Sequence, residues 1–262
     1  MRYFLEVSYK GTNYAGFQIQ KNAVTVQGEI EKALATIFRL NVNLTGASRT
    51  DAGVHALQNY FHFDIDFEWP GQTLYNLNAI LPNDIVIKAV THVPDNAHCR
   101  FHAISREYSY YIYFLKNPFL IETAWFYPYK LHIEALQEAA SSIRNYTNFT
   151  SFSKRNTQAY TNLCTITKSN WLHDNDRLIY NVKSNRFLRG MVRGLVGTML
   201  QVGRGTLSLY NFNNIIEAHD CTKANFSTPA KGLFLTAVEY PSSILPPDSQ
   251  KRVSLSVLNG KR

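Results

Sequence analysis

The chain has 262 residues, of which 45% are hydrophobic and 18% are charged. This length suits one large domain or two of ordinary size, and the composition is that of a globular protein rather than a disordered one. The formal net charge of +8 favours an acidic partner such as nucleic acid, although unrelated soluble proteins share such a charge.

Several other classes of protein are disfavoured by the sequence. Cys99, Cys164 and Cys221 form no Cys-x-x-Cys pair, so neither a zinc knuckle nor a disulfide framework is predicted. The sequence shows no run of about 18 apolar residues and no signal peptide. We therefore expect a soluble, cytoplasmic protein without a membrane partner.

Strand and helix patterns alternate in the first part of the chain. Residues 2–9 alternate as a strand does, and the spacing of apolar residues over 26–38, behind a possible Thr25 cap, predicts a helix. Further strands are expected at 42–47, 61–67 and 85–90, and a short helix at 74–81. The resulting order, β-α-β-β-α-β, is the split βαβ arrangement.

The second part repeats this order without repeating the sequence. Strands are expected at 107–114, 163–171, 178–184 and 233–240, and helices at 133–143, 187–199 and 208–218. We therefore predict an α+β fold of two ferredoxin/RRM-like split βαβ units, whose antiparallel sheets have a groove between or across them. The predicted domains are residues 1–104 and 105–245, followed by a tail over 246–262.

Residues 46–57 are the stretch most suggestive of chemistry. If the segment is extended, Arg49 and Asp51 project to the same side, and the arginine can keep the carboxylate ionised and fix its direction. Gly53 permits a turn, and His55 comes just before a strand-like run. Because most Arg-x-Asp pairs are ordinary turn or surface pairs, the spacing alone leaves both interpretations open.

Two further sets of charged or metal-binding residue types have to be weighed. Arg186, Arg189 and Arg193 would share a face of the helix predicted at 187–199, either as a solvated basic face or as a row that grips a phosphate backbone. Histidines also recur between the two halves, but no acidic or cysteine ligand supports their spacing, so we expect no metal site. These histidines are His92, His98 and His102.

Five segments, taken together, resemble the TruA-type tRNA pseudouridine synthases. Residues 46–57 match the family's catalytic loop, Gly/Ala-x-Arg-Thr-Asp-Ala-Gly-Val-His, almost completely. The other matching segments are Tyr9 to Gln18, Arg106 to Tyr113, Phe187 to Arg193 and Lys231 to Tyr240. Departures such as Lys10 for the usual Asp, Phe17 for the usual Trp and Arg189-Gly190 for a His-His pair lie outside the catalytic loop.

The resemblance implies a role for particular residues. Asp51 would be the catalytic carboxylate, with Arg49 and Arg193 acting beside it. A flat ring with a polar tip suits a base that has been turned out of its stack, and the family places such a tyrosine against the target uracil. The residues expected to bind the substrate are Tyr108, Leu233, Arg186, Arg189 and His55.

The resemblance also implies an activity. The family isomerises uridine to pseudouridine at tRNA positions 38–40, in the anticodon stem-loop, without a cofactor or metal and as a homodimer. The two sheets would then form a basic RNA-binding cleft for tRNA. Asp51 could add to C1′, add to C6 of the base or assist loss of the C2′ proton, and the sequence does not choose among these routes.

Two alternatives stay open. A non-catalytic tRNA-binding protein or chaperone of the same fold explains the charge, the aromatic residues and the order of elements equally well. It does not explain why Arg49, Asp51, Tyr108 and Arg193 occur together. An isomerase of the same family that acts on a different RNA is the other alternative.

Overall fold

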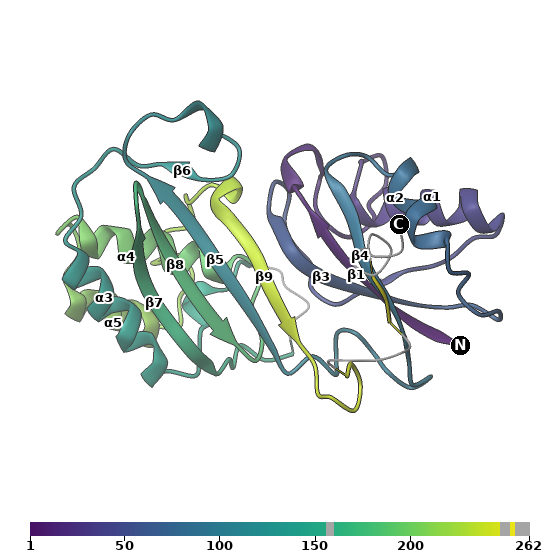
Figure 1. Ribbon diagram of the computed structural model, residues 1–262. Helices are drawn as coiled ribbons and strands as arrows, with labels where there is room; N and C mark the ends of the chain where they lie inside the picture. The colour runs from purple at the N-terminus through teal and green to yellow at the C-terminus, as the bar shows by residue number, and fades with distance from the viewer. Residues whose placement is uncertain (156–159, 247–251, 255–262) are drawn as a thin grey trace. The chain divides into compact units, whose positions relative to one another are not determined.

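The structure, a computed structural model, describes residues 1–155, 160–246 and 252–254. The chain divides into two compact units (Figure 1): the first contains Met1–Ile104 and the described residues from Leu235 onward, and the second is Ser105–Phe234. The sequence patterns instead assign residues 105–245 to one domain and 246–262 to a tail. In the described part of the chain, no helix is both long and apolar enough to cross a membrane.

A mainly antiparallel sheet forms the first unit, and α1 (Val26–Phe38) packs against α2 (Thr73–Ile80) beside it (Figure 1). Its strands are β1 (Arg2–Tyr9), β2 (Thr45–Gly46), β3 (His55–Asp64), β4 (Ile85–Val93), the part of β9 (Leu233–Glu239) that starts at Leu235, and β10 (Arg252–Ser254). The strand order across the sheet is β10-β4-β1-β3-β9, and β2 pairs with β3. The element order β1-α1-β2-β3-α2-β4 brings the Asp51 segment between β2 and β3.

Both faces of β1 are buried, and described residues from Leu235 onward cover one of them. Side chains alternate along a strand, so Phe4 and Glu6 lie on the face opposite Leu5. Phe4 packs edge-on against the ring of Tyr240 at 5.3 Å, and the Glu6 carboxylate pairs with Arg252 of β10 at 2.8 Å. Residues that follow β9 therefore cover this face of the sheet.

Two details near α1 test the sequence patterns. The expected Thr25 cap is confirmed, because its Oγ1 accepts a hydrogen bond from the Gly28 N–H at 3.2 Å. The strand expected at 42–47 shrinks to the two residues of β2, so most of that prediction is wrong. The reason is that helix α1 supplies the hydrogen bonds of Leu44: Glu31 accepts from its N–H at 2.9 Å, and Gln27 donates to its carbonyl at 2.9 Å.

The second unit also joins an antiparallel sheet to helices (Figure 1). Its strands, in the order β5-β8-β7, are β5 (Ser105–Tyr113), β8 (Arg177–Ser184) and β7 (Ile166–Asp174), and the short β6 (Trp125–Phe126) runs parallel to β5. Its helices are α3 (Ile133–Ser142), α4 (Met191–Gly203) and α5 (Leu209–Glu217). Helix α3 contacts α4, α5 and β7, so these helices form one layer on the sheet.

Helix α4 begins later than the sequence predicts. The expected helix starts at residue 187, but α4 starts at Met191, and Gly190 caps it in a left-handed conformation with φ of 75°. Arg186 and Arg189 therefore lie before the helix, and the prediction that they share a helical face with Arg193 is wrong. Within α4, Gly197 packs closely against a neighbouring segment, because a Cβ there would lie 2.4 Å from the carbonyl oxygen of Asn225.

Candidate active site

The Asp51 loop, which we define as residues 47–54, links β2 to β3 in the first unit. The Val54 N–H donates to the Asp51 carbonyl at 3.2 Å, and Gly53 has a φ of 75°, so the loop closes in a tight turn. The turn leaves Asp51 half-buried and Arg49 exposed. The one carboxylate of this loop thus sits at the edge of the folded unit rather than within its core.

Arg49 does not hold the Asp51 carboxylate as the spacing suggests. Within the described parts of the chain, the Arg49 guanidinium makes no hydrogen bond and no ion pair. Arg49 instead presents its charge to solvent, where a phosphate or a base can meet it.

Buried hydrogen bonds from two strands hold the Asp51 loop. The Tyr9 hydroxyl of β1 lies 2.8 Å from Thr50 Oγ1, and Asn59 of β3 donates from Nδ2 to the Ser48 carbonyl at 2.8 Å. The Phe17 N–H donates to the Thr50 carbonyl at 3.1 Å. The sequence analysis did not identify Thr50 or Asn59 as functional residues, because nothing in the spacing of these residues shows that they meet.

The segment after β1 presses against the other side of the loop. Gly11 begins the 3₁₀ helix η1 (Gly11–Asn13), and a Cβ there would lie 2.0 Å from the Val54 carbonyl oxygen, so only glycine fits. The Gly11 N–H donates to Nδ1 of His55 at 3.0 Å. His55 is 1% exposed. The structure therefore places this predicted substrate-binding residue in the core, where it supports η1.

Asp84, which precedes β4, also holds the segment that follows β1 through hydrogen bonds. The Tyr14 hydroxyl donates to the Asp84 carboxylate, and the Asn13 amide donates to it at 3.0 Å. The Lys10 N–H donates to the Asp84 carbonyl at 2.9 Å. Burial, aided by the hydrogen bond to Asp84, raises the pKa of Tyr14 above its ordinary value, so the hydroxyl stays a donor at neutral pH.

In the second unit, the aromatic and apolar residues expected to bind substrate lie on strands. Tyr108 of β5 is 8% exposed, and its ring meets the ring of Phe187 edge-to-face at 5.0 Å. Leu233, the first residue of β9, is buried. Phe187 was not among the predicted site residues, although it lies in one of the segments that resemble the family.

The three arginines of the second unit occupy different surroundings. Arg193 is half-buried on the first turn of α4, and its Nε donates to the Thr228 carbonyl at 2.6 Å. Arg186 is half-buried and Arg189 is exposed, both in the segment before the helix. The structure thus divides the predicted site residues into two sets: Arg49, Asp51 and His55 in the first unit, and Tyr108, Arg186, Arg189, Arg193 and Leu233 in the second.

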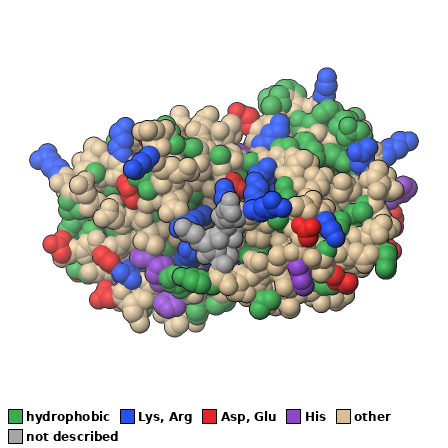
Figure 2. All heavy atoms as spheres, turned by 180° about the vertical axis from the view of Figure 1, so that it is seen from behind, with side chains coloured by type: hydrophobic (Ala, Val, Ile, Leu, Met, Phe, Trp, Pro, Cys, Tyr) green, Lys and Arg blue, Asp and Glu red, His purple; other side chains and the backbone are tan. Residues whose placement is uncertain are grey.

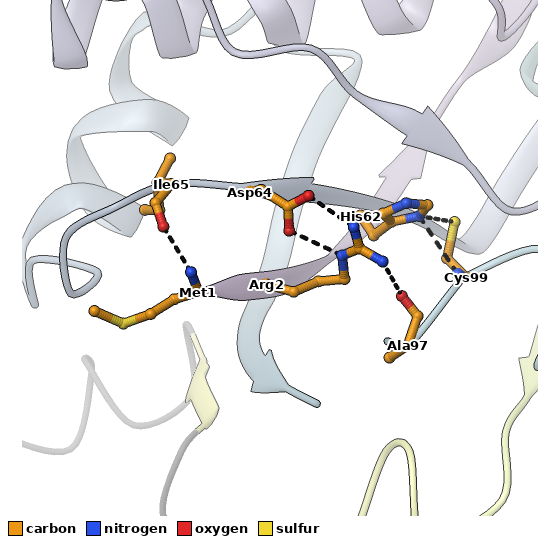
Figure 3. A network of polar contacts seen from close by, with 7 residues as sticks. All are labelled: Met1, Arg2, His62, Asp64, Ile65, Ala97 and Cys99. Carbon is orange, nitrogen blue, oxygen red and sulfur yellow. Dashed lines mark hydrogen bonds and ion pairs between the residues drawn. The ribbon is translucent and has the colours of Figure 1, made fainter. Parts of the chain in front are cut away.

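A cluster of possible metal ligands lies elsewhere in the first unit, and Figure 3 shows two of its members, His62 and Cys99. Nitrogen or sulfur atoms of His62, His98 and Cys99 lie within 4.8 Å of one another. Nδ1 of His62 is 3.1 Å from the Cys99 sulfur, which also donates to the Thr45 carbonyl at 3.0 Å. Nδ1 of His98 accepts the backbone N–H of Arg100 at 3.2 Å, whereas a metal-bound imidazole normally donates from its second nitrogen. The donor set therefore fits a hydrogen-bonded support better than a metal site.

Comparisons with known proteins agree with the arrangement of these segments. Residues 6–102 and 146–241 match the family model described as tRNA pseudouridine synthase. The chain is 45% identical over 249 residues to tRNA pseudouridine synthase A of Parabacteroides distasonis, with 94% of this chain and 98% of that protein covered. It is 41% identical over 261 residues to the protein of the same name from Bacteroides thetaiotaomicron, with 98% and 97% covered.

The match runs through both units, and the relatives are covered almost from end to end. A third relative, tRNA pseudouridine synthase A of Azobacteroides pseudotrichonymphae, is 43% identical over 244 residues, which cover 93% of this chain and 98% of that protein. The Asp51 loop and the glycine-bearing segment that supports it lie within the residues that match the family model, and the three relatives cover 93% to 98% of the chain. The chain belongs to the tRNA pseudouridine synthase family.

Proposed function

We propose that the protein isomerises uridine to pseudouridine in tRNA, at positions 38–40 of the anticodon stem-loop, with Asp51 as the catalytic carboxylate. The observation that carries the proposal is the Asp51 loop itself, in a chain that belongs to this family. Its carboxylate is half-buried on a loop whose backbone is held by buried side chains of two strands. Such a loop keeps a reacting group in one place, which is the main requirement of this kind of chemistry.

The reaction needs a carboxylate but no oxidant and no phosphate donor. The glycosidic bond between N1 of uracil and C1′ breaks, the base rotates, and a bond between C5 and C1′ forms. C5 then loses its proton and N1 gains one, so that the product is an isomer of the substrate. Asp51 begins this sequence by addition to C1′ or C6, or by assisting loss of the C2′ proton. A uridine within a stem must first leave its stack, at a cost of a few kcal/mol, which contacts with the phosphate backbone offset.

The remaining predicted residues take the roles that their surroundings allow. In this proposal the Tyr108 ring stacks on the uracil, Leu233 excludes water from it, and Arg193 acts beside Asp51. Arg49, Arg186 and Arg189 bind phosphates; Arg49 and Arg189 are exposed, as such contacts require. His55 is left out, because its side chain is buried against η1.

The excess of positively charged residues supports a nucleic-acid substrate. The chain carries 27 Lys and Arg against 19 Asp and Glu, and Figure 2 shows Lys and Arg side chains at the surface of one face, interspersed with acidic ones. We further propose that the protein works in the cytoplasm, without a cofactor and as a homodimer on tRNA. Sedimentation of the protein with and without tRNA tests the homodimer.

The activity test uses an unmodified tRNA transcript with uridines at 38, 39 and 40. Pseudouridine is mapped by carbodiimide labelling and primer extension, for the wild type and for Asp51→Ala. We expect product from the wild type and at least about a 10³-fold slower reaction from Asp51→Ala, with tRNA binding retained in a gel-shift assay. The matched control is Asp66→Asn, which changes an exposed carboxylate of the same unit and should leave the rate unchanged.

Each other outcome has a definite meaning. Binding without product from any variant, across several tRNAs, favours the non-catalytic tRNA-binding protein. Equal product from wild type and Asp51→Ala shows that another residue is catalytic. Product at uridines outside 38–40, or only with another RNA, shows that the protein carries out the proposed reaction on a different substrate from the one proposed.

A further inference from the structure

A chain of buried, uncharged hydrogen-bonding groups runs from β3 to the Asp51 loop. Asn59 is 0% exposed, and its Nδ2 donates to the Ser48 carbonyl at 2.8 Å and to the Tyr9 hydroxyl at 3.4 Å. The Tyr9 hydroxyl in turn lies 2.8 Å from Thr50 Oγ1. Ser48 and Thr50 lie on either side of Arg49. The Asn59 amide thus holds Ser48, and the Tyr9 phenol holds Thr50.

The direction of the hydrogen bonds that Asn59 makes follows from its amide. The Asn59 Oδ1 accepts the N–H of Tyr60 at 2.9 Å, which identifies the other end of the amide as the two-proton donor. One of those protons goes to the Ser48 carbonyl and the other to the Tyr9 oxygen. The next hydrogen bond joins the hydroxyls of Tyr9 and Thr50, and either of them can be its donor.

A network of this kind fixes the backbone that carries Asp51. It is buried, so water does not compete for its bonds, and such networks are worth more in a low-dielectric interior than at a surface. Thr50 is adjacent to Asp51 and is held at its side chain by Tyr9 and at its carbonyl by Phe17. The backbone next to Asp51 therefore cannot shift far unless these bonds break.

We propose that Tyr9 and Asn59 are positioning residues for the isomerisation, which act through Thr50 and Ser48 on the direction of the Asp51 carboxylate. This inference rests on the proposed function. Neither side chain is exposed, so neither is expected to touch the RNA. A displacement of about 1 Å of a reacting group can cost about 100-fold in rate, so loss of the network should act on kcat and leave tRNA binding intact.

The first test is Tyr9→Phe in the full-length protein. Phenylalanine keeps the ring that packs at 5.8 Å from the ring of Phe17, and removes only the hydroxyl. We expect kcat for pseudouridine formation to fall about tenfold, with KM for tRNA within about twofold of wild type. Thr50→Val should lower kcat similarly, and Thr50→Ser, which keeps a hydroxyl, should recover most of the loss.

Tyr3→Phe is the matched control. Tyr3 lies on the same strand, is equally buried and also loses a hydrogen-bonded hydroxyl, which accepts the Trp69 N–H at 3.1 Å. That hydroxyl has no path to the Asp51 loop. Both variants should therefore lower Tm to a similar extent, whereas only Tyr9→Phe should lower kcat.

A second measurement separates positioning from general loss of stability. In a double-mutant cycle of Tyr9→Phe and Asn59→Ala, residues of one network give effects on kcat that are not additive, so the double variant should be little slower than Asn59→Ala alone. Equal kcat for Tyr9→Phe and Tyr3→Phe would overturn the inference, as would a loss confined to KM. If the wild type itself makes no pseudouridine, the proposed function fails instead, and the two failures are thereby distinguished.

Discussion

Two loops that carry expected site residues are held in contrasting ways. The Asp51 loop of the first unit is fixed by side chains of β1 and β3, whose bonds to Ser48 and Thr50 are buried. The arginine segment of the second unit, which we define as residues 186–190, is held through its backbone. There the Arg189 carbonyl accepts the N–H of Lys154 at 3.0 Å, and the Leu188 carbonyl accepts that of Met191 at 3.1 Å.

The difference follows from what each loop would do in the proposed reaction. A carboxylate that attacks one atom must keep one direction, and a rigid framework of buried bonds supplies this. Guanidinium groups that meet a phosphate backbone adapt to it, so anchoring the main chain and leaving the side chains in solvent is sufficient. Substitutions at the glycine that packs against the Asp51 loop and at the glycine that ends the arginine segment test this contrast.

The largest expected effect comes from Gly11→Ala. The new Cβ would lie 2.0 Å from the backbone oxygen of Val54, which cannot move without shifting the turn at Asp51. Overpacking of this kind should lower the free energy of unfolding by about 3 kcal/mol and reduce kcat as well. Urea denaturation and the tRNA assay measure the two effects. Gly71→Ala, where nothing lies within 4 Å, should change neither, and a Gly11→Ala protein with normal kcat would show that the loop tolerates movement.

A smaller effect is expected from Gly190→Ala, at the end of the arginine segment. Gly190 has a φ of 75°, which costs an alanine about 1 kcal/mol, and the nearest atom is the flexible Lys154 side chain. The free energy of unfolding should fall by about that amount, and tRNA affinity should weaken. The kcat at saturating tRNA should equal that of the wild type. Gly205→Ala has a φ of 72° with open space around it, so it should share the loss of stability but keep full affinity. A large loss of kcat in Gly190→Ala would remove the contrast between the two loops.

The smallest effect on activity comes from a change of pH, which sharpens the contrast within the first unit. Amide and hydroxyl groups support the Asp51 loop, whereas the cluster in Figure 3 contains His62, whose pKa is lowered to about 4 by burial, by His98 and by Arg2. An unfolded histidine titrates near pH 6.5, so between these values the unfolded state binds more protons. Stability should therefore fall as pH decreases from about 6.5 to about 4.

Thermal unfolding of the wild type and of His62→Gln over this pH range checks the sign. The variant should show a shallower decline in Tm, because it lacks the group that gains a proton on unfolding. His173→Gln, an exposed histidine of the second unit, serves as the control and should keep the wild-type slope. A wild-type Tm that rises toward pH 4 would contradict the expected protonation of His62.

Much of the fold could be predicted from the sequence, because alternation and helical spacing are local. The strands that contain Tyr3, Tyr108 and Leu233, and the helix behind Thr25, follow from such patterns. Residues 42–47 mislead because Val42 and Leu44 have buried apolar side chains, although the backbone hydrogen bonds of Leu44 go to side chains of helix α1. The arginine spacing misleads because it reads as helical, while Gly190 adopts a conformation that delays the start of α4.

The candidate site was less predictable, because its supports are distant in sequence. The resemblance located Asp51, but Tyr9 and Asn59 are 50 residues apart and reach the loop only when β1 and β3 pair. His55 lies within a family motif and was therefore expected at the substrate, whereas its Nδ1 accepts a hydrogen bond from the backbone N–H of Gly11. A motif identifies a group of residues that occur together, and the three-dimensional contacts show which of these residues support the others.

The first unit contains both the beginning of the chain and the residues from Leu235 onward, whereas the second is one continuous segment, Ser105–Phe234. During synthesis the second unit is therefore complete, and free to fold, while the first still lacks two of its strands. Until those arrive, Phe4 and Glu6 have neither Tyr240 nor Arg252 to cover them. Synthesis of the unit that carries Asp51 thus begins before that of the second unit and ends after it.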